Sequence, residues 1–191
     1  MSDRITEKRN SLKKEHVAVS VVAAIFLVAL YFAIFVLSDQ DGETSGSLSH
    51  RITEAIVEQI SRIAGNGWTE EIRRSMVAYW EHPVRKLAHF SEYAVMGILV
   101  YSMWRPWRKR SRKFYGFVIL WVFISAALDE GHQLMVAGRY GSFMDVLLDT
   151  SGGCFGVFLC VTAEKIHGKW IGRLAQKRDE SFQRKFPKKN A

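Results

Sequence analysis

The chain has only two cysteines among its 191 residues, and this scarcity excludes a fold held together by disulfides. Cys154 and Cys160 lie six residues apart in one apolar segment. If that segment is helical, a rise of about 1.5 Å per residue separates them by about 9 Å along the axis, which is too far for a disulfide. We therefore expect both cysteines to be small buried apolar residues.

The chain also lacks the motifs that identify several large enzyme classes. It contains no nucleophile elbow, no P-loop, no dinucleotide-binding fingerprint and no internal repeat. This absence argues against the hydrolases, nucleoside triphosphatases and dinucleotide-dependent enzymes that carry those motifs. The length is enough for one domain.

Long apolar segments are what the chain does contain. Residues 17–37 carry no charge and are long enough to cross about 30 Å of hydrocarbon as a helix. A signal peptide is the alternative, but the run is longer than a typical signal sequence core, and the Ser38-Asp39-Gln40-Asp41 stretch that follows is a poor cleavage site. Three further candidate spans, each interrupted by polar residues, are 84–104, 114–136 and 142–163.

Charge alternates between the segments that connect these spans. Residues 1–16, 105–113 and 164–191 are basic, whereas residues 39–83 and 129–141 are acidic or nearly neutral. This is the positive-inside pattern for four membrane helices with both termini in the cytoplasm. The net charge of +8 is therefore expected to face anionic lipid headgroups, and no nucleic acid partner is predicted.

The predicted fold class is all-α, a polytopic protein of the inner (cytoplasmic) membrane with four transmembrane helices. An amphipathic outward helical loop separates the first helix from the second. The predicted organisation is a basic cytoplasmic N-terminus at 1–16, a first transmembrane helix at 17–38, the outward loop at 39–83, a core of three transmembrane helices at 84–163, and a basic cytoplasmic tail at 164–191.

Two short helices are predicted in the outward loop. Ser49 and Gly65-Asn66-Gly67 bound the first, and Thr69 caps the second. Pro83 then suits the first turn of the second span. We expect both loop helices to lie on the outer membrane surface or to cover the bundle; docking of a partner protein is the alternative. The apolar face of the first helix is a row of isoleucines: Ile52, Ile56, Ile60 and Ile63.

Ionisable and polar residues gather at three places in the last three spans. Charge at membrane depth is costly, so such residues usually mark a functional interior. Helical phase and depth put all three groups in one layer, about 8 to 13 Å below the outer surface. Gly152 and Gly156 share a face with the acids of the last span and allow another helix to approach closely. The three groups are Arg85, Lys86, His89 and Glu92; Asp129, Glu130, His132 and Gln133; and Arg139, Ser142, Asp145 and Asp149.

If this layer is a site, its residues divide by chemistry into two sets. Imidazole and carboxyl groups can transfer protons, which makes the candidate catalytic residues His89, Glu92, Asp129 and Asp145. Arginine and lysine would hold a phosphate. The candidate substrate-binding residues are Arg85, Lys86, Glu130, Gln133, Arg139, Ser142 and Asp149. The structural alternative is a buried ion-pair network that only specifies packing.

No cofactor is predicted from the spacing of these residues. A divalent metal could bind to His89 and Glu92 together with Asp129, His132 or Asp145, but that spacing matches no established metal signature. Ser142 could be read as a nucleophile beside Asp145. A serine that caps the last membrane helix is the commoner meaning of this pattern.

At these same residues the sequence resembles the VanZ-like family of bacterial membrane proteins, over roughly residues 80–163. The matching motifs are Lys86-Leu87-Ala88-His89 with Tyr93, Asp129-Glu130-Gly131-His132-Gln133, Gly138-Arg139, Ser142-x-x-Asp145 and Asp149-x-x-Gly152. Asp149 stands where the family often has Asn, and Ala137 where Pro often precedes the Gly-Arg pair. The resemblance implies resistance to teicoplanin-type lipoglycopeptide antibiotics or to related envelope-acting peptides, and it brings no settled reaction with it.

Three hypotheses about function follow. The first is an enzyme or enzyme-like binder that acts on an anionic or lipid-linked cell-envelope molecule in the outer leaflet. The second is a non-catalytic membrane module that sequesters a ligand or partner. The third is a small proton-coupled transporter, since acids within spans suit proton relays. Four helices without a visible repeat make a transporter the weakest of the three.

Overall fold

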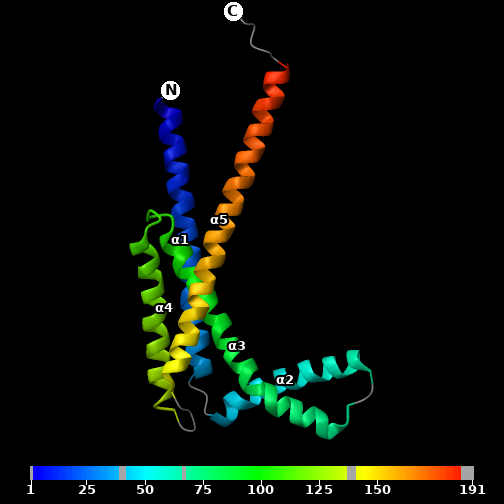
Figure 1. The fold of residues 1–191 in the computed structure, drawn as a ribbon. Coiled ribbons are helices and arrows are strands. Elements are labelled where there is room, and N and C mark those ends of the chain that lie inside the picture. The colour runs from blue at the N-terminus through cyan, green and yellow to red at the C-terminus, as the bar shows by residue number, and fades with distance from the viewer. Residues whose placement is uncertain (1, 39–41, 66–67, 137–140, 186–191) are drawn as a thin grey trace, which may run out of the picture. The chain divides into compact units, whose positions relative to one another are not determined.

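The computed structural model describes residues 2–38, 42–65, 68–136 and 141–185. These residues form helices and no strands, so the predicted all-α class is confirmed. The chain divides into two compact units, residues 1–157 and 158–191, and the second unit contains the continuation of the last helix. The helices, shown in Figure 1, are α1 (Ser2–Ser38), α2 (Gly42–Ala64), α3 (Glu70–Trp104), α4 (Arg112–Gln133) and α5 (Phe143–Lys185).

Three helices contain segments long and apolar enough to cross a membrane: Lys13–Val36, Arg112–Gln133 and Phe143–Trp170. Large apolar side chains on these segments remain exposed; Val28 and Phe32 of α1, for example, are 69% and 70% exposed. Such surfaces need a lipid environment, so the chain is a membrane protein. Among the described helices α3 is long enough but does not meet the same criterion, because polar residues interrupt its apolar half.

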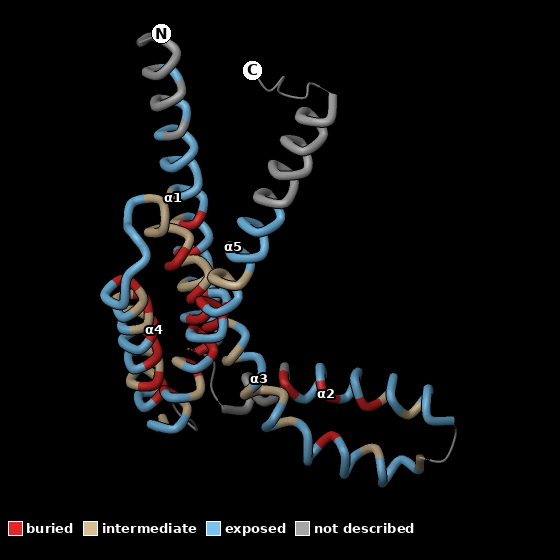
Figure 2. The backbone as a smooth tube through the Cα atoms, turned by 45° about the horizontal axis from the view of Figure 1, so that its top comes forward, coloured by how far each residue is buried: buried red, intermediate tan, exposed pale blue. Residues whose placement is uncertain are grey.

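Helix α3 differs from the prediction of a separate surface helix followed by a span. It runs from Glu70 to Trp104 without interruption, and Pro83 lies inside it and not in a first turn. Thr69 caps its start, as predicted, because the Thr69 hydroxyl accepts a hydrogen bond from the Ile72 amide. A proline within a helix removes one backbone hydrogen bond and bends the helix without having to end it. Figure 2 shows α3 changing direction between its two halves.

The first half of α3 pairs with α2 in an antiparallel hairpin. Helix α2 ends before Gly65, whose φ of 73° is the left-handed conformation typical of a residue that follows a helix. Val57 and Val77 are buried between the two helices, and His50 bonds Glu81 at 3.2 Å. The isoleucine row predicted as the apolar face of α2 remains exposed, as does the apolar end of the first half of α3. Placement of this face on the outer membrane surface stays a prediction.

The bundle core lies between the second half of α3 and the facing side of α4. Tyr93, Met96 and Val100 of α3 are fully buried, and so are Val118 and Val122 of α4. Figure 2 shows these buried faces turned toward one another. The side chains recur at helical spacing, so each helix buries one face and leaves the other for lipid.

Helix α1 is attached to α4 by polar groups at the middle of its apolar segment. The hydroxyls of Tyr31 and Ser125 form a hydrogen bond. The Trp121 indole N–H donates to the Tyr31 hydroxyl at 2.9 Å, and Ser125 donates to the Trp121 carbonyl at 2.9 Å. In a setting without water such bonds specify which helix faces pack together.

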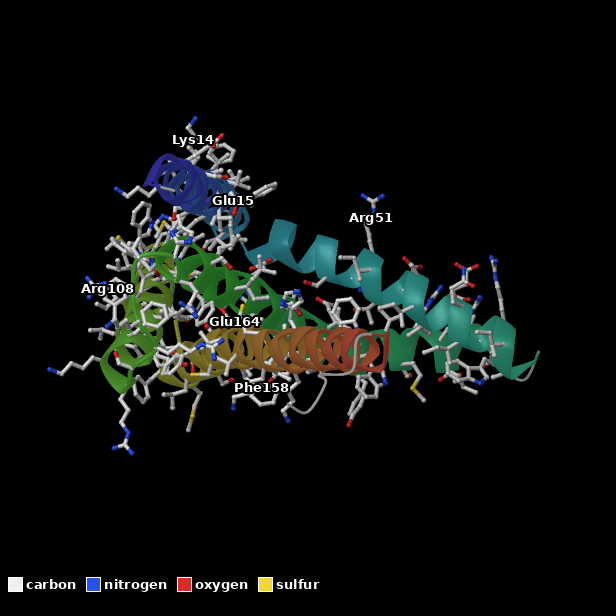
Figure 3. The ribbon with its side chains drawn as sticks, turned by 90° about the horizontal axis from the view of Figure 1, so that it is seen from above. Lys14, Glu15, Arg51, Arg108, Phe158 and Glu164 are labelled. Carbon is white, nitrogen blue, oxygen red and sulfur yellow. The ribbon has the colours of Figure 1, made fainter. Side chains whose placement is uncertain are left out.

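Two of the predicted cytoplasmic basic segments lie at the same end of the bundle. Trp107, in the turn after α3, donates its indole N–H to Ser20 of α1 at 2.7 Å, and Ser20 donates to the Met103 carbonyl at 2.8 Å. Figure 3 shows Lys14 and Arg108 on the outside of this end. The basic turn after α3 therefore lies against α1. Placement of this end of the bundle in the cytoplasm stays a prediction.

Helices α3 and α5 approach each other closely through glycines. A Cβ atom added at Gly152 or Gly156 would come closer than 3.0 Å to the backbone of Phe90 or Ala94, respectively. A Cβ at Gly97 of α3 would meet the backbone of Gly153 in the same way. The predicted role of Gly152 and Gly156 in close helix packing is therefore confirmed.

The cysteines are only partly as predicted. Neither is in a disulfide, but Cys154 is exposed and Cys160 is half-buried, so the expectation that both are buried is wrong. The helical face that carries Cys154 is turned away from the bundle, and for a membrane helix that face is covered by lipid instead of protein.

Replacing Gly156 by alanine should disrupt the α3–α5 contact. The new methyl group would overlap the Ala94 carbonyl, and overpacking of this kind typically destabilises a protein by about 1–3 kcal/mol. Thermal unfolding of the purified protein in detergent would measure the loss. Gly116→Ala on α4 is the matched control, because a Cβ at Gly116 meets nothing within 4 Å. Equal stability of the two variants would contradict the close contact.

Candidate functional site

Side chains from α3, α4 and the start of α5 converge at one place in the bundle. One carboxylate oxygen of Asp129, one of Asp149 and a ring nitrogen of His89 all lie within 4.8 Å of one another. Each residue comes from a different helix, and the three are separated by long stretches of sequence. We call the surrounding group the polar cluster; it comprises Lys86, His89, Glu92, Asp129, Glu130, Gln133, Asp145 and Asp149.

Lys86 and Asp145 form the ion pair that closes one side of the polar cluster. The Lys86 Nζ atom lies 2.6 Å from the Asp145 carboxylate, and it joins α3 to the first turn of α5. Both side chains are about one-third exposed. Solvent weakens such a pair, so Lys86 remains available for exchange onto another anion.

Glu130 holds the start of α5 against the end of α4. Its buried carboxylate accepts a hydrogen bond from the Ser142 amide at 2.8 Å. The Ser142 hydroxyl in turn accepts from the Met144 amide at 3.2 Å, which is the hydrogen bond of a helix cap. The prediction that Ser142 caps the last membrane helix is therefore confirmed. These contacts give Glu130 and Ser142 a structural role; binding of substrate by either stays a prediction.

Asp129 is oriented by a residue one turn further along α4. The Gln133 side-chain amide donates to Asp129 Oδ2 at 3.1 Å, and Gln133 is itself buried. This bond leaves the other carboxylate oxygen of Asp129 to face the polar cluster or a ligand. The i, i+4 spacing of the two residues in the sequence was the signal for this pair.

Asp149 is the member of the polar cluster whose carboxylate is buried without a hydrogen bond from the described residues. The residue is completely buried, and neither carboxylate oxygen has a hydrogen-bond partner among the described residues. A negative charge on Asp149 is also unfavourable because four other carboxylates repel it, those of Glu130, Asp129, Asp145 and Glu92. A buried carboxylate without partners is unfavourable unless a proton or a cation neutralises it.

One of the predicted phosphate-binding arginines, Arg85, does not join Lys86 in the polar cluster. The Arg85 guanidinium is 3.4 Å from Glu81, one turn earlier on α3, and not within the polar cluster. This pairing arises because α3 continues through Pro83 and so brings Glu81 beneath Arg85. Arg139 lies outside the described residues, so its predicted role is untested.

An apolar cavity of about 390 Å³ begins directly beside the polar cluster. A second cavity of about 300 Å³ continues along α4 and shares Tyr31, Ser125 and Leu128 with the first. We call the two together the apolar groove. The first cavity is lined by Tyr31, Ile34 and Phe35 of α1, by Tyr93 and Met96 of α3, and by Ser125, Leu128, Asp129 and His132 of α4.

Asp129 connects the apolar groove with the polar cluster, and His132 lines the groove beside it. Asp129 lines the groove and also belongs to the cluster, and the His132 ring packs 5.1 Å from the Phe35 ring of α1. The contribution of α1 to the groove was not predicted from the sequence. Isolated polar atoms in apolar spans, at Tyr31 and Ser125, were the only available signal.

Carboxylates outnumber the described cations in this arrangement. Such a site attracts a cation or a proton, and an anion could enter only with positive charge supplied to it. The groove beside it suits a hydrocarbon chain. The arrangement places acidic and basic side chains directly beside an apolar cavity.

Comparison with known proteins identifies the family of the chain. A search of curated proteins and a search of solved structures each found no match. The family model described as VanZ/LLP1 matches residues 23–164, a range that contains most of the apolar segment of α1 and every residue of the polar cluster. Since this match covers most of the chain, the protein belongs to the VanZ/LLP1 family.

Proposed function

We propose that this protein binds a lipid-linked, phosphate-bearing molecule of the cell envelope and thereby lowers susceptibility to lipoglycopeptide antibiotics. The phosphate headgroup lies at the polar cluster, and the hydrocarbon chain lies in the apolar groove. The protein sits in the inner (cytoplasmic) membrane with four spans, the polar cluster open toward the outer leaflet and both termini in the cytoplasm.

The observation that carries this proposal is the junction of groove and cluster at Asp129. A purely structural ion-pair network needs no cavity beside it, whereas a lipid needs an apolar site and a polar site in direct continuity. The groove is lined by α1 as well as by the two core helices, which accounts for an apolar first helix in the site.

Lys86 is the described residue best suited to meet the headgroup. Its pair with Asp145 is partly exposed, so a phosphate can replace the carboxylate as the partner of the ammonium group. Arg139 is the second predicted cation. His89, Glu92 and Asp129 are the groups available for proton transfer if the bound molecule is altered chemically.

The second candidate function is sequestration of the same molecule without a reaction. The Lys86–Asp145 pair and the Glu130–Ser142 hydrogen bond favour it, because both hold helices together and neither needs chemistry. Both candidate functions have the same ligand, and they differ in whether the protein alters that ligand chemically.

The proposed topology predicts which loops face the outside of the cell. In a background with both cysteines replaced, His82→Cys should react with a membrane-impermeant maleimide in intact cells, because it precedes the span within α3. Lys109→Cys should react only after permeabilisation, because it lies in the basic turn between α3 and α4. Labelling of both from the same side would show that α3 does not span.

Loss of the polar cluster should abolish resistance without loss of the protein. Expression in a susceptible bacterium should raise the minimal inhibitory concentration of teicoplanin, and His89→Ala or Lys86→Ala should return it to the empty-vector value. His82→Ala is the matched control for His89, since His82 is an exposed histidine of the same helix. Membrane immunoblots confirm equal expression of the variants.

Lipid mass spectrometry of the same strains separates the two candidate functions. A changed envelope lipid in wild-type cells, absent in the His89→Ala strain, supports a reaction. An unchanged lipid pool together with a phospholipid or lipid-linked precursor that co-purifies with the protein supports sequestration. Retained resistance in a well-expressed His89→Ala variant contradicts both.

Obstructing the apolar groove should displace the lipid chain. Leu128 lines both cavities and is 70% exposed, so Leu128→Trp places an indole in the groove without burying it in the core. Native mass spectrometry should then detect less bound lipid. Phe123→Trp adds an indole to the same helix at a position that lines neither cavity, and it should leave bound lipid unchanged.

A further inference from the structure

We infer that His89, Asp129 and Asp149 bind one divalent metal ion of the Zn²⁺ and Mn²⁺ class. The ligand atoms already lie within 4.8 Å of one another. An ion bound at about 2.1 Å holds neighbouring ligand atoms about 3–3.5 Å apart, so a small inward movement of three side chains completes the site.

Asp149 supplies an independent reason for a cation at this point. Both of its oxygens are without hydrogen-bond partners among the described residues, although the side chain is completely buried. Four other carboxylates act on it. A divalent ion would bond one of these oxygens directly and offset the accumulated negative charge.

The described cations near the polar cluster are already engaged with other acids. Lys86 pairs with Asp145 at 2.6 Å, and Arg85 pairs with Glu81 at 3.4 Å. Within the part of the chain that the structure describes, neither forms an ion pair with Asp129 or Asp149. Arg139 lies outside that part, so a variant of Arg139 is needed to test whether it is the counter-ion of these acids.

The chemical nature of the three ligands restricts which metal ions would bind at this site. One imidazole with two carboxylates suits Zn²⁺ and Mn²⁺, whereas Ca²⁺ and Mg²⁺ favour oxygen ligands alone. Gln133 donates a hydrogen bond to Asp129. Metal ligands are usually oriented by a hydrogen bond of this kind. Three protein ligands leave further positions on the ion open.

The open positions deepen the proposed function, on which this step rests. A phosphate oxygen of the lipid headgroup would take one of them, and Lys86, which precedes His89 on α3, would hold a second oxygen. The metal would then bridge an anionic ligand and an acidic site that otherwise repel each other.

Metal binding can be tested without any assay of resistance. The full-length protein is purified in detergent, treated with EDTA and titrated with Mn²⁺ by electron paramagnetic resonance and with Co²⁺ by absorption spectroscopy; elemental analysis gives the Zn²⁺ content after reloading. We expect one ion per chain. Affinity should fall at least about tenfold in His89→Ala, Asp129→Asn and Asp149→Asn, since loss of a group that merely orients a ligand already costs about 10–100-fold.

Two controls keep the result interpretable. Asp149→Leu removes the buried charge, so it should fold without metal yet bind none, whereas His82→Ala should bind as the wild type does. If wild-type protein binds no ion, or if the ligand variants bind as tightly as His82→Ala, the inference is overturned. Metal binding that occurs only in Arg139→Ala would likewise overturn it, by identifying Arg139 as the counter-ion of the acids.

A parallel measurement distinguishes this inference from the proposed function. Bound lipid is quantified before and after EDTA treatment and again after reloading with Zn²⁺. Lipid that leaves with the metal and returns with it supports the bridge. Lipid that stays bound after EDTA treatment overturns the bridge and leaves the proposed function standing. Stoichiometric metal with no bound lipid under any condition supports the metal site and contradicts the proposed function.

Discussion

The direct backbone contact between α3 and α5 is the constraint on which the rest of the site depends. Gly152 lies one turn beyond Asp149, and it touches the backbone of Phe90, the residue that follows His89. Contact at this point therefore brings the histidine of one helix to the carboxylate of the other. A side chain at Gly152 or Gly156 would separate the helices and with them the groups of the polar cluster.

The protein tolerates the acidic side chains of the polar cluster because most of them accept a hydrogen bond or form an ion pair. Glu130 is satisfied by the Ser142 amide, Asp145 by Lys86, and Asp129 in part by Gln133. Only Asp149, among the described acids, is left without a hydrogen bond while fully enclosed. A structural network gives every buried carboxylate a hydrogen-bond partner, whereas a ligand site leaves one without a partner. This criterion, and not the number of acids, distinguishes the two.

The apolar groove lies directly beside the polar cluster, and Asp129 belongs to both. Helix α1 contributes no charged side chain to the groove, and hydrogen bonds join it to α4 through Tyr31, Ser125 and Trp121 near the groove wall. The same residues that attach α1 to the bundle therefore shape the place where a hydrocarbon chain would lie. Family membership of the chain, with its match beginning inside α1 at residue 23, is consistent with α1 belonging to the functional unit.

The sequence by itself determined the features that arise from neighbouring residues. Apolar length identified three segments that are long enough to cross a membrane, the Thr69 and Ser142 caps followed from local hydrogen bonding, and Gly152 and Gly156 marked a face without side chains. Only the tertiary structure decided that α3 continues through Pro83, that Arg85 pairs with Glu81, and that His89, Asp129 and Asp149 meet beside a groove partly formed by α1. The physical reason is distance along the chain: caps and phase depend on atoms a few residues apart, whereas these contacts depend on how separate helices pack.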